Sequence, residues 1–395
     1  MRYFGGIMIR SSLLAGVVAV ATWSAAAHAE DDLFARIEVM AQSGEDWAQY
    51  MLGKTYLNGA DFAGTPSRHV AQDLEQAELW LNRAAGQGNV AAEVSLAKAY
   101  DEGPLKKDAD KAITWYEKVA EDAEDTDERD ANARLCQLVM DKPVHDPETA
   151  EPYCAFMAAH GKPEGYFGVA KAYETGDGVD ANPLKALDIY RELAGTYGYR
   201  PAMEKLAFGY RDGGALAARD DAQALTWFLR LAEVAPETYL IEVAHRLEKG
   251  VGAPAQPVDA GRYYLAAAKA GNAEAKTWLV KHPAVTAAWV ERSTIKDMKG
   301  ALNVTDVNAD GKNSYDYYPV HAKDNEIEGS ATVNCRVSAK GVLDRCLVVA
   351  ESPDGEGFGA ATLQVMRQYV WVKPDSVARM SGKLVRIVYK WKLDK

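Results

Sequence analysis

Four cysteines are the residues of this chain whose chemistry is easiest to interpret. They are Cys136, Cys154, Cys335 and Cys346, and none of them forms the Cys-x-x-Cys spacing of a metal site or a redox pair. An even number of widely spaced cysteines in an exported chain favours structural disulfides, with free buried thiols as the alternative. The pairing depends on the elements that carry the cysteines.

Other motifs that could do chemistry are weak. The run Gly176 to Ala181 fits a dinucleotide-binding pattern, as does Gly250 to Ala255, but each follows a helical pattern instead of the strand that such a site needs. The histidines are scattered, and the sequence holds no Gly-x-Ser-x-Gly or His-Glu-x-x-His motif. We therefore expect a protein that is not an enzyme and has no catalytic residue, metal or cofactor.

A calcium loop is the nearest alternative to that expectation. Asp306, Asn308 and Asp310 match the opening of an EF-hand loop, yet position 12 is Tyr317, where a calcium loop needs a bidentate acid. Asn and Asp side chains also stabilise turns by hydrogen-bonding to nearby backbone. A turn is the favoured interpretation.

The elements that carry the cysteines follow a six-fold internal repeat. Its signature is Ala-x-x-aromatic-large, and successive alanines are 35, 38, 36, 38 and 36 residues apart. A period of that size fits one helical hairpin, which buries its apolar face only by stacking on its neighbours. The alanines are Ala77, Ala112, Ala150, Ala186, Ala224 and Ala260. The expected fold is an α-α superhelix, a solenoid of helical hairpins.

The other helix of each hairpin repeats a small residue, then Tyr three residues on, then Gly three residues later. Spacing of three places the small residue and the aromatic on one helix face, and the Gly is expected to end the helix in a left-handed cap. The copies are Gly53/Tyr56/Gly59, Ala97/Tyr100/Gly103, Ala170/Tyr173/Gly176, Ala207/Tyr210/Gly213 and the variant Ala244/Leu247/Gly250.

This double signature resembles the Sel-like branch of tetratricopeptide-type repeats. It reads YMLGKTYLNG and then EQAELWLNRAAGQGN, and it runs from about Glu45 to Asn272. The resemblance implies a scaffold or adapter that binds other proteins and inherits no catalytic residue. The repeated aromatics are then expected to form the solenoid core.

The repeat register pairs the first two cysteines. Cys136 takes the small-residue position of the degenerate third repeat, and Cys154 takes the large-residue position that Leu81 and Tyr116 fill in other repeats. These positions lie on the two antiparallel helices of one hairpin, so the side chains should meet. We predict a Cys136–Cys154 disulfide that stabilises the weakest repeat.

The second pair lies in the segment TVNCRVSAKGVLDRCLVV. If Lys340-Gly341 is a two-residue hairpin turn, Val337 opposes Asp344 and Cys335 directly opposes Cys346. Opposed Cβ atoms on neighbouring strands lie about 4.5 to 5.5 Å apart, which is close to the reach of a disulfide. We predict a Cys335–Cys346 disulfide.

The N-terminus has the pattern of an export signal. Arg2 and Arg10 precede an apolar stretch and then Ala27-His28-Ala29, which suits cleavage after Ala29. The apolar core is shorter than the roughly 20 residues of a membrane-spanning helix, and an uncleaved inner-membrane anchor is the alternative. A periplasmic location is favoured.

The charge balance bears on the kind of partner. The chain has a formal net charge of -12, while from Tyr318 onward 12 basic residues outnumber 9 acidic ones. An acidic helical array disfavours nucleic acid, whose phosphates attract basic surfaces. The expected segments are a signal peptide at 1–29, the solenoid of six repeats at 30–272, a capping helix and linker at 273–317, and a small α+β domain at 318–395.

The last of these segments combines strands with one clear helix. The expected elements are strands at 331–337, 342–350 and 384–393 and a helix from Phe358 to Tyr369. In the last strand, apolar residues alternate with a mostly polar set, so that one face suits a core and the other suits water. The polar set is Arg386, Val388, Lys390 and Lys392.

Landmarks of this segment resemble the C-terminal domain of TonB-type energy transducers. They include Tyr318-Pro319, Gly329, Gly341, Phe358 and Pro374, in matching order. In that family the last strand is an edge that accepts an extended peptide of an outer-membrane receptor. The resemblance therefore implies a peptide-binding edge at Arg386, Val388, Lys390 and Lys392. Basic residues also protect an edge from aggregation, which is the plainer interpretation.

Together these patterns predict a periplasmic adapter for protein partners in the cell envelope, such as an outer-membrane receptor or the cell-wall machinery. Membrane contact is expected only if the N-terminal segment is uncleaved. A true energy transducer and a regulator of cell-wall enzymes are the alternatives. The helical array stands where a transducer has a proline-rich spacer, which disfavours the transducer.

Overall fold

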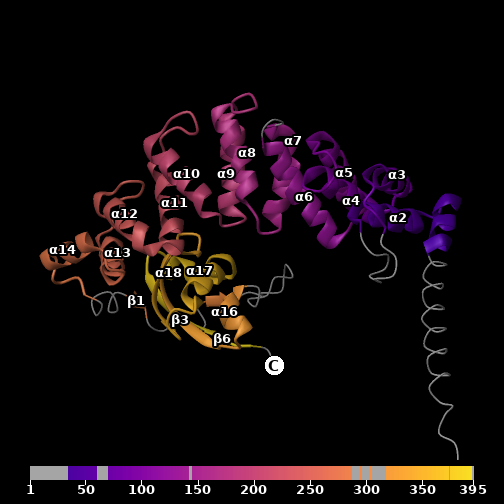
Figure 1. Ribbon diagram of the computed structural model, residues 1–395. Helices are drawn as coiled ribbons and strands as arrows, with labels where there is room; N and C mark the ends of the chain where they lie inside the picture. Colours follow the sequence, from indigo (N-terminus) through magenta and orange to yellow (C-terminus); the bar gives the residue numbers. More distant parts are fainter. Residues whose placement is uncertain are drawn as a thin grey trace, which may run out of the picture. The chain divides into compact units, whose positions relative to one another are not determined.

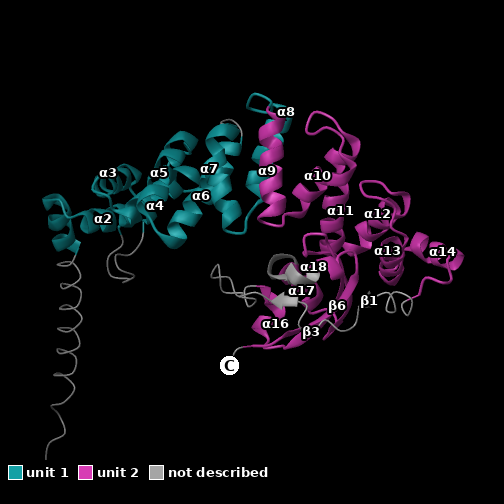
Figure 2. Ribbon diagram, turned by 180° about the vertical axis from the view of Figure 1, so that it is seen from behind, with its two compact units in different colours: residues 1–181 teal, residues 182–395 magenta. Residues whose placement is uncertain are grey.

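A computed structural model gives the structure of residues 34–59, 70–141, 145–286, 294–295, 302–304, 317–372 and 374–393. The chain divides into two compact units, residues 1–181 and residues 182–395 (Figure 2). The predicted signal peptide and the loop from Asp306 to Asp310 lie outside the described residues.

Unit 1 consists of successive helices that pair as hairpins (Figure 1). A helix at residues 34–43 precedes the first hairpin, and its Phe34 and Ile37 pack with Leu52 and Trp80. The pairs are α2 (Asp46–Asn58) with α3 (Leu74–Ala85), α4 (Val90–Asp101) with α5 (Ala109–Asp122), and α6 (Asp125–Met140) with α7 (Pro147–Ala159), and then follows α8 (Glu164–Thr175).

Unit 2 begins with α9 (Pro183–Gly195), the second helix of the fourth predicted hairpin. The helices that follow are α10 (Arg200–Asp212) with α11 (Asp221–Val234), α12 (Pro236–Lys249) with α13 (Pro257–Lys269), and α14 (Ala273–Lys281). The predicted helical-hairpin fold is confirmed in both units.

The repeat signature explains where the second helix of a hairpin begins. In the first five repeats, an Asp or Asn four residues before the repeated alanine accepts backbone N–H groups of the first turn through its side chain, which is N-capping. These caps are Asp73, Asp108, Asp146, Asn182 and Asp220. The six alanines themselves are buried, and their small side chains let neighbouring helices approach closely.

The predicted glycine caps hold at most of the repeats. Gly59, Gly176 and Gly250 end their helices in the left-handed conformation, and Gly213 also has a positive φ. The prediction is wrong at Gly103, because α4 ends at Asp101 with Glu102 as its C-cap, and Gly103 has no positive φ. The glycine loops at 176–181 and 250–255 each follow a helix, as expected for a turn.

Two tyrosines of the array, one partly buried and one buried, hydrogen-bond through their hydroxyl groups to acids of the preceding hairpin. Tyr153 donates to Glu117 over 3.0 Å, and Tyr239 donates to Glu204 over 2.9 Å. Burial, reinforced by the hydrogen bond and charge of Glu117, raises the pKa of Tyr153 to about 12. These two tyrosines therefore pack in the array while their polar hydroxyl groups keep hydrogen-bond partners.

The C-terminal domain belongs to unit 2 and is an α+β structure. Its sheet has the strand order β1-β6-β3-β4, and a separate pair joins β2 to β5. The strands are β1 (Thr294–Ile295), β2 (Leu302–Val304), β3 (Gly329–Val337), β4 (Leu343–Ser352), β5 (Val370–Val372) and β6 (Leu384–Trp391), and the helices are α16 (Val320–Asp324), α17 (Phe358–Tyr369) and α18 (Pro374–Met380).

The core of this domain contains a cluster of three aromatic side chains. The rings of Tyr318 and Phe358 pack edge to face, with their centroids 5.7 Å apart. The ring centroid of Trp391 lies 5.5 Å from that of Tyr318. The indole of Trp391 donates to the hydroxyl of Thr362 over 2.9 Å, which satisfies its buried N–H. Helix α17 thereby holds the end of β6 in place.

Gly329 is required by this core. A Cβ at position 329 would lie 2.2 Å from a ring carbon of the fully buried Phe358. We expect Gly329→Ala to lower the free energy of unfolding of the domain by about 1–3 kcal/mol, because the ring has no space to move. Urea denaturation of the full chain measures the loss.

Gly195→Ala is the matched control for Gly329→Ala. Position 195 closes a helix, and a Cβ there meets no atom within 4 Å. Alanine favours a helix over glycine by up to about 1 kcal/mol, so stability should stay constant or rise. Equal losses from both variants would contradict the packing argument.

Candidate peptide-binding edge

The structure forms the two predicted cysteine pairs. The sulfur atoms of Cys136 and Cys154 are 2.06 Å apart, and those of Cys335 and Cys346 are 2.01 Å apart. Gly165 packs directly on the first pair, because a Cβ at that position would lie 2.3 Å from the sulfur of Cys136. The first disulfide joins α6 to α7, and the second joins β3 to β4.

The predicted two-residue turn between β3 and β4 is wrong. Val337 pairs with Leu343 instead of Asp344, because Ser338 donates to Val342 and the turn is one residue longer. A β-bulge then shifts the register back before the cysteines, with Arg345 at a φ of 49°. The two shifts cancel, so Cys335 still meets Cys346.

Alternate residues of β6 direct their backbone N–H and C=O groups to opposite sides of the strand. Val337 donates to the carbonyl of Lys383, and hydrogen-bonded pairs alternate along an antiparallel ladder. The register between β3 and β6 runs without a bulge from Leu384 to Trp391. It follows that Val385, Ile387 and Tyr389 direct their N–H and C=O groups toward β3. Arg386, Val388 and Lys390 direct theirs outward.

The structure places three of the four predicted edge residues together. Arg386, Val388 and Lys390 alternate on the sheet face opposite the core, and Val388 is 59% exposed. Lys392 is exposed but lies just after the end of β6, so it flanks the edge instead of belonging to it. The edge thus presents outward backbone groups beside cationic side chains.

One short strand occupies the beginning of this edge. β1 pairs with β6 in parallel, through Thr294 with Leu384 and Ile295 with Val385. Among the described residues no other strand adjoins the outer side of β6. Beyond Arg386, at Val388 and Lys390, no strand of the described residues lies on that side of β6.

The opposite edge of the sheet is treated differently. Helix α13 donates to backbone carbonyls of β4 through Lys269, which bonds to Val349 over 3.2 Å, and Arg262, which bonds to Arg345 over 3.1 Å. These two side chains occupy backbone carbonyl groups that an added strand would need as hydrogen-bond acceptors. This contact was not predictable from the sequence, because Arg262 and Lys269 resemble ordinary polar residues of a repeat helix.

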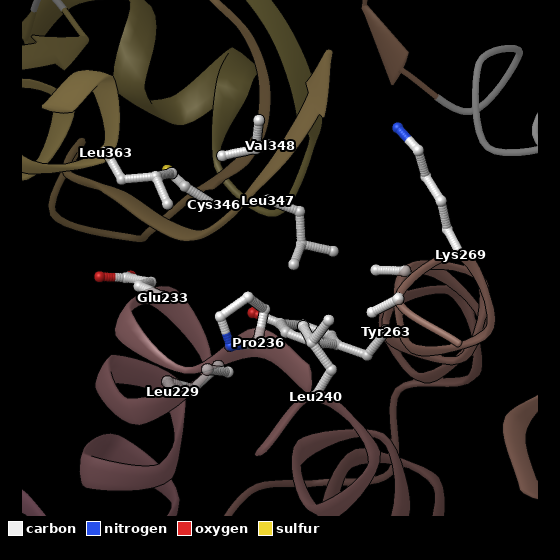
Figure 3. A pocket seen from close by; sticks show the side chains of 13 residues that line it. Leu229, Glu233, Pro236, Leu240, Tyr263, Lys269, Cys346, Leu347, Val348 and Leu363 are labelled. Carbon is white, nitrogen blue, oxygen red and sulfur yellow. The ribbon is translucent and has the colours of Figure 1, made fainter. Parts of the chain in front are cut away.

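A cavity of about 300 Å³ lies beside this contact, within unit 2. Figure 3 shows Leu347 projecting from β4 toward Tyr263 and Leu240 on the helical side, with Lys269 at one end. Its walls are mostly apolar, and burial raises the pKa of the Tyr263 hydroxyl well above its usual range. The cavity thus lies between the helices and β4, next to the hydrogen bonds that Lys269 and Arg262 of α13 make to β4.

Neither metal chemistry nor a membrane span is evident in the described ranges. No three His, Cys, Asp or Glu side chains there are grouped as metal ligands would be. Within the same part of the chain, no helix has both the length and the apolar character needed to cross a bilayer.

Two protein families match the chain. The model of the Gram-negative bacterial TonB protein C-terminal domain matches residues 314–391. The Sel1 repeat model matches residues 48–89, 90–123, 163–194, 200–234 and 240–272. The matches leave out residues 124–162, where α6 and α7 form the disulfide-linked helical pair predicted as the degenerate repeat.

Solved structures similar to this chain are repeat proteins. One is a protective antigen of uropathogenic Escherichia coli strains with an SLR fold, at 24% identity and a TM-score of 0.34, with 66% of this chain and 54% of that chain covered. The match thus spans about half the length of that antigen. Another is a Sel1 repeat protein from Oxalobacter formigenes, at 21% identity and a TM-score of 0.32, with 64% and 81% covered. A search among curated proteins finds no match.

Proposed function

Since the chain carries five Sel1 repeats followed by a TonB C-terminal domain, we propose that it is a periplasmic scaffold that captures an extended segment of a partner protein along β6. Both families are in general protein-interaction modules without catalytic activity. The observation that carries the proposal is the outer side of β6 at Val388 and Lys390, whose backbone groups point away from β3 and adjoin no strand of the described residues.

Strand addition explains how such an edge gains affinity and selectivity. The outward N–H and C=O groups of Val388 and Lys390 can bind any extended backbone, and the flanking side chains select among sequences. The cations on and after β6 favour a partner segment with acidic residues. Because α13 takes carbonyls of β4, the β6 edge is the better acceptor of the two.

The envelope location rests on two supports. The TonB C-terminal domain is a Gram-negative envelope module, and two disulfides suit an oxidising compartment outside the cytoplasm. A partner in the outer membrane or the cell-wall machinery fits that location.

The N-terminal residue of the mature protein decides between scaffold and transducer. We expect the exported protein to begin at Glu30, because Ala27 and Ala29 are the small side chains that a signal peptidase requires. Intact-mass analysis of protein from the native envelope reads this directly. A mature form that retains Met1 would instead support a membrane-anchored energy transducer.

Site-specific crosslinking tests the scaffold proposal. A photoreactive amino acid replaces Val388 in the full chain, and the protein is irradiated in envelope extracts. We expect a crosslink to an extended segment of a discrete partner. The control carries the same group at Val280 of α14, which is 81% exposed, so exposure alone cannot explain a difference. Crosslinking from Val280 and not from Val388 would move partner binding to the helical array.

A further inference from the structure

A buried carboxylate joins the last repeat to the C-terminal domain. Asp259 of α13 is fully buried and accepts from Arg262 over 2.9 Å. Arg336 of β3 reaches it through two bonds of 2.6 and 2.7 Å, a bidentate arrangement. Arg345 of β4 approaches the same carboxylate at 3.3 Å. One acid on the helix thus binds cations on two strands.

The β-bulge of β4 creates this convergence. The register shift turns Arg345 toward α13, where it also contacts Gln256. The guanidinium of Arg262 donates to the carbonyls of Asn334 and Arg345, over 2.6 and 3.1 Å, at the point where the ladder between the strands is interrupted. The helix therefore supplies hydrogen bonds that the sheet lacks at the bulge.

The charge balance makes this contact depend on Asp259. Burial alone would raise the pKa of its carboxyl, but the hydrogen bonds and charges of Arg336 and Arg262 outweigh burial and hold the pKa below its usual range. Burial raises the pKa of neighbouring Asp344, so that residue is a weaker counter-ion. Without Asp259 the three guanidinium groups would repel one another with little compensation.

We propose that Asp259 is a latch that fixes the C-terminal domain to the last repeat and keeps the β4 edge covered. The latch acts inside one chain and does not depend on what β6 captures. When it opens, α13 and β4 separate, while α17 and β6 keep their own core around Phe358 and Trp391.

Hydrogen exchange of the full chain tests the latch with Asp259→Asn. We expect exchange in peptides from α13 and β4 to rise about a hundredfold, because removing one partner of a buried ion pair leaves uncompensated charge. Peptides from α17 and β6 should stay protected. The matched control is Asp212→Asn in α10, which removes the same charge from an exposed pair with Arg211 and should change neither region.

A charge-balanced variant covers the case in which Asp259→Asn fails to fold. Asp259→Asn combined with Arg336→Gln removes one charge of each sign, and we expect it to fold with faster exchange confined to α13 and β4. Exchange as slow as in the native protein would overturn the latch. Loss of protection across α17 and β6 as well would also overturn it, because Asp259 would then be needed to fold the domain.

Discussion

Replacing Val388 with proline is expected to reduce partner capture at least about tenfold while the C-terminal domain stays folded. Proline lacks the N–H donor, and its ring blocks the approach of a strand on that side. The N–H of Val388 points away from β3, so no bond within the sheet is lost. The side chain is mostly exposed, so the core loses little packing.

Capture is measured as the amount of the partner, once identified by crosslinking, that each uncrosslinked variant retains in a pull-down. Two further variants serve as controls. Val388→Thr keeps the donor and a β-branched side chain, so it should bind normally. Ile387→Pro removes an N–H that points toward β3, so it should unfold the sheet. If a folded Val388→Pro protein captures the partner as well as Val388→Thr does, binding belongs to the repeats.

Removing the disulfide between α6 and α7 is expected to lower the free energy of unfolding of unit 1 by about 3 kcal/mol. The bond closes a loop with a sequence separation of 18 residues. It lies in the one predicted repeat that the Sel1 model leaves unmatched, so packing by consensus residues is weakest there. Replacing Cys136 and Cys154 together with alanine avoids a free thiol, and urea denaturation measures the change.

Cys335 and Cys346 provide the comparison. Their bond joins strands that are already hydrogen-bonded to each other, so its removal should leave α6 and α7 unaffected in hydrogen exchange. Peptide mapping without reductant should find both bonds in the native protein. Four free thiols, or a bond between the two cysteine pairs, would refute the repeat register and the strand register from which the two pairings are derived.

The first disulfide was predictable because every hairpin shares one geometry. Once the period is known, the positions of Cys136 and Cys154 follow from equivalent residues in better copies. The turn before Leu343 was not predictable in the same way. Its extra residue and the later bulge cancel at the cysteines, and Arg345 adopts a positive φ without the glycine that would have marked it.

The two edges of the sheet also differ in how far the sequence could predict them. Alternation in the last strand predicted β6 and the sheet face of Arg386, Val388 and Lys390. Coverage of β4 by α13 was hidden, because positions equivalent to Asp259 and Arg262 hold Gln223 and Thr226 in α11, which are exposed. Only contact with the C-terminal domain, through residues such as Arg336, which lies 77 residues after Asp259, makes the same positions buried.

The latched hairpin also limits how this array can lengthen in evolution or design. A repeat array ordinarily grows by duplicating any unit, since each unit contacts only its neighbours. Here α13 also contacts a sheet through Asp259, Arg262 and Lys269. A duplicate inserted after α13 would separate the sheet from the helix that fits it. New repeats are therefore tolerated upstream of α12, where they would change the reach of the scaffold and leave its terminal domain in register.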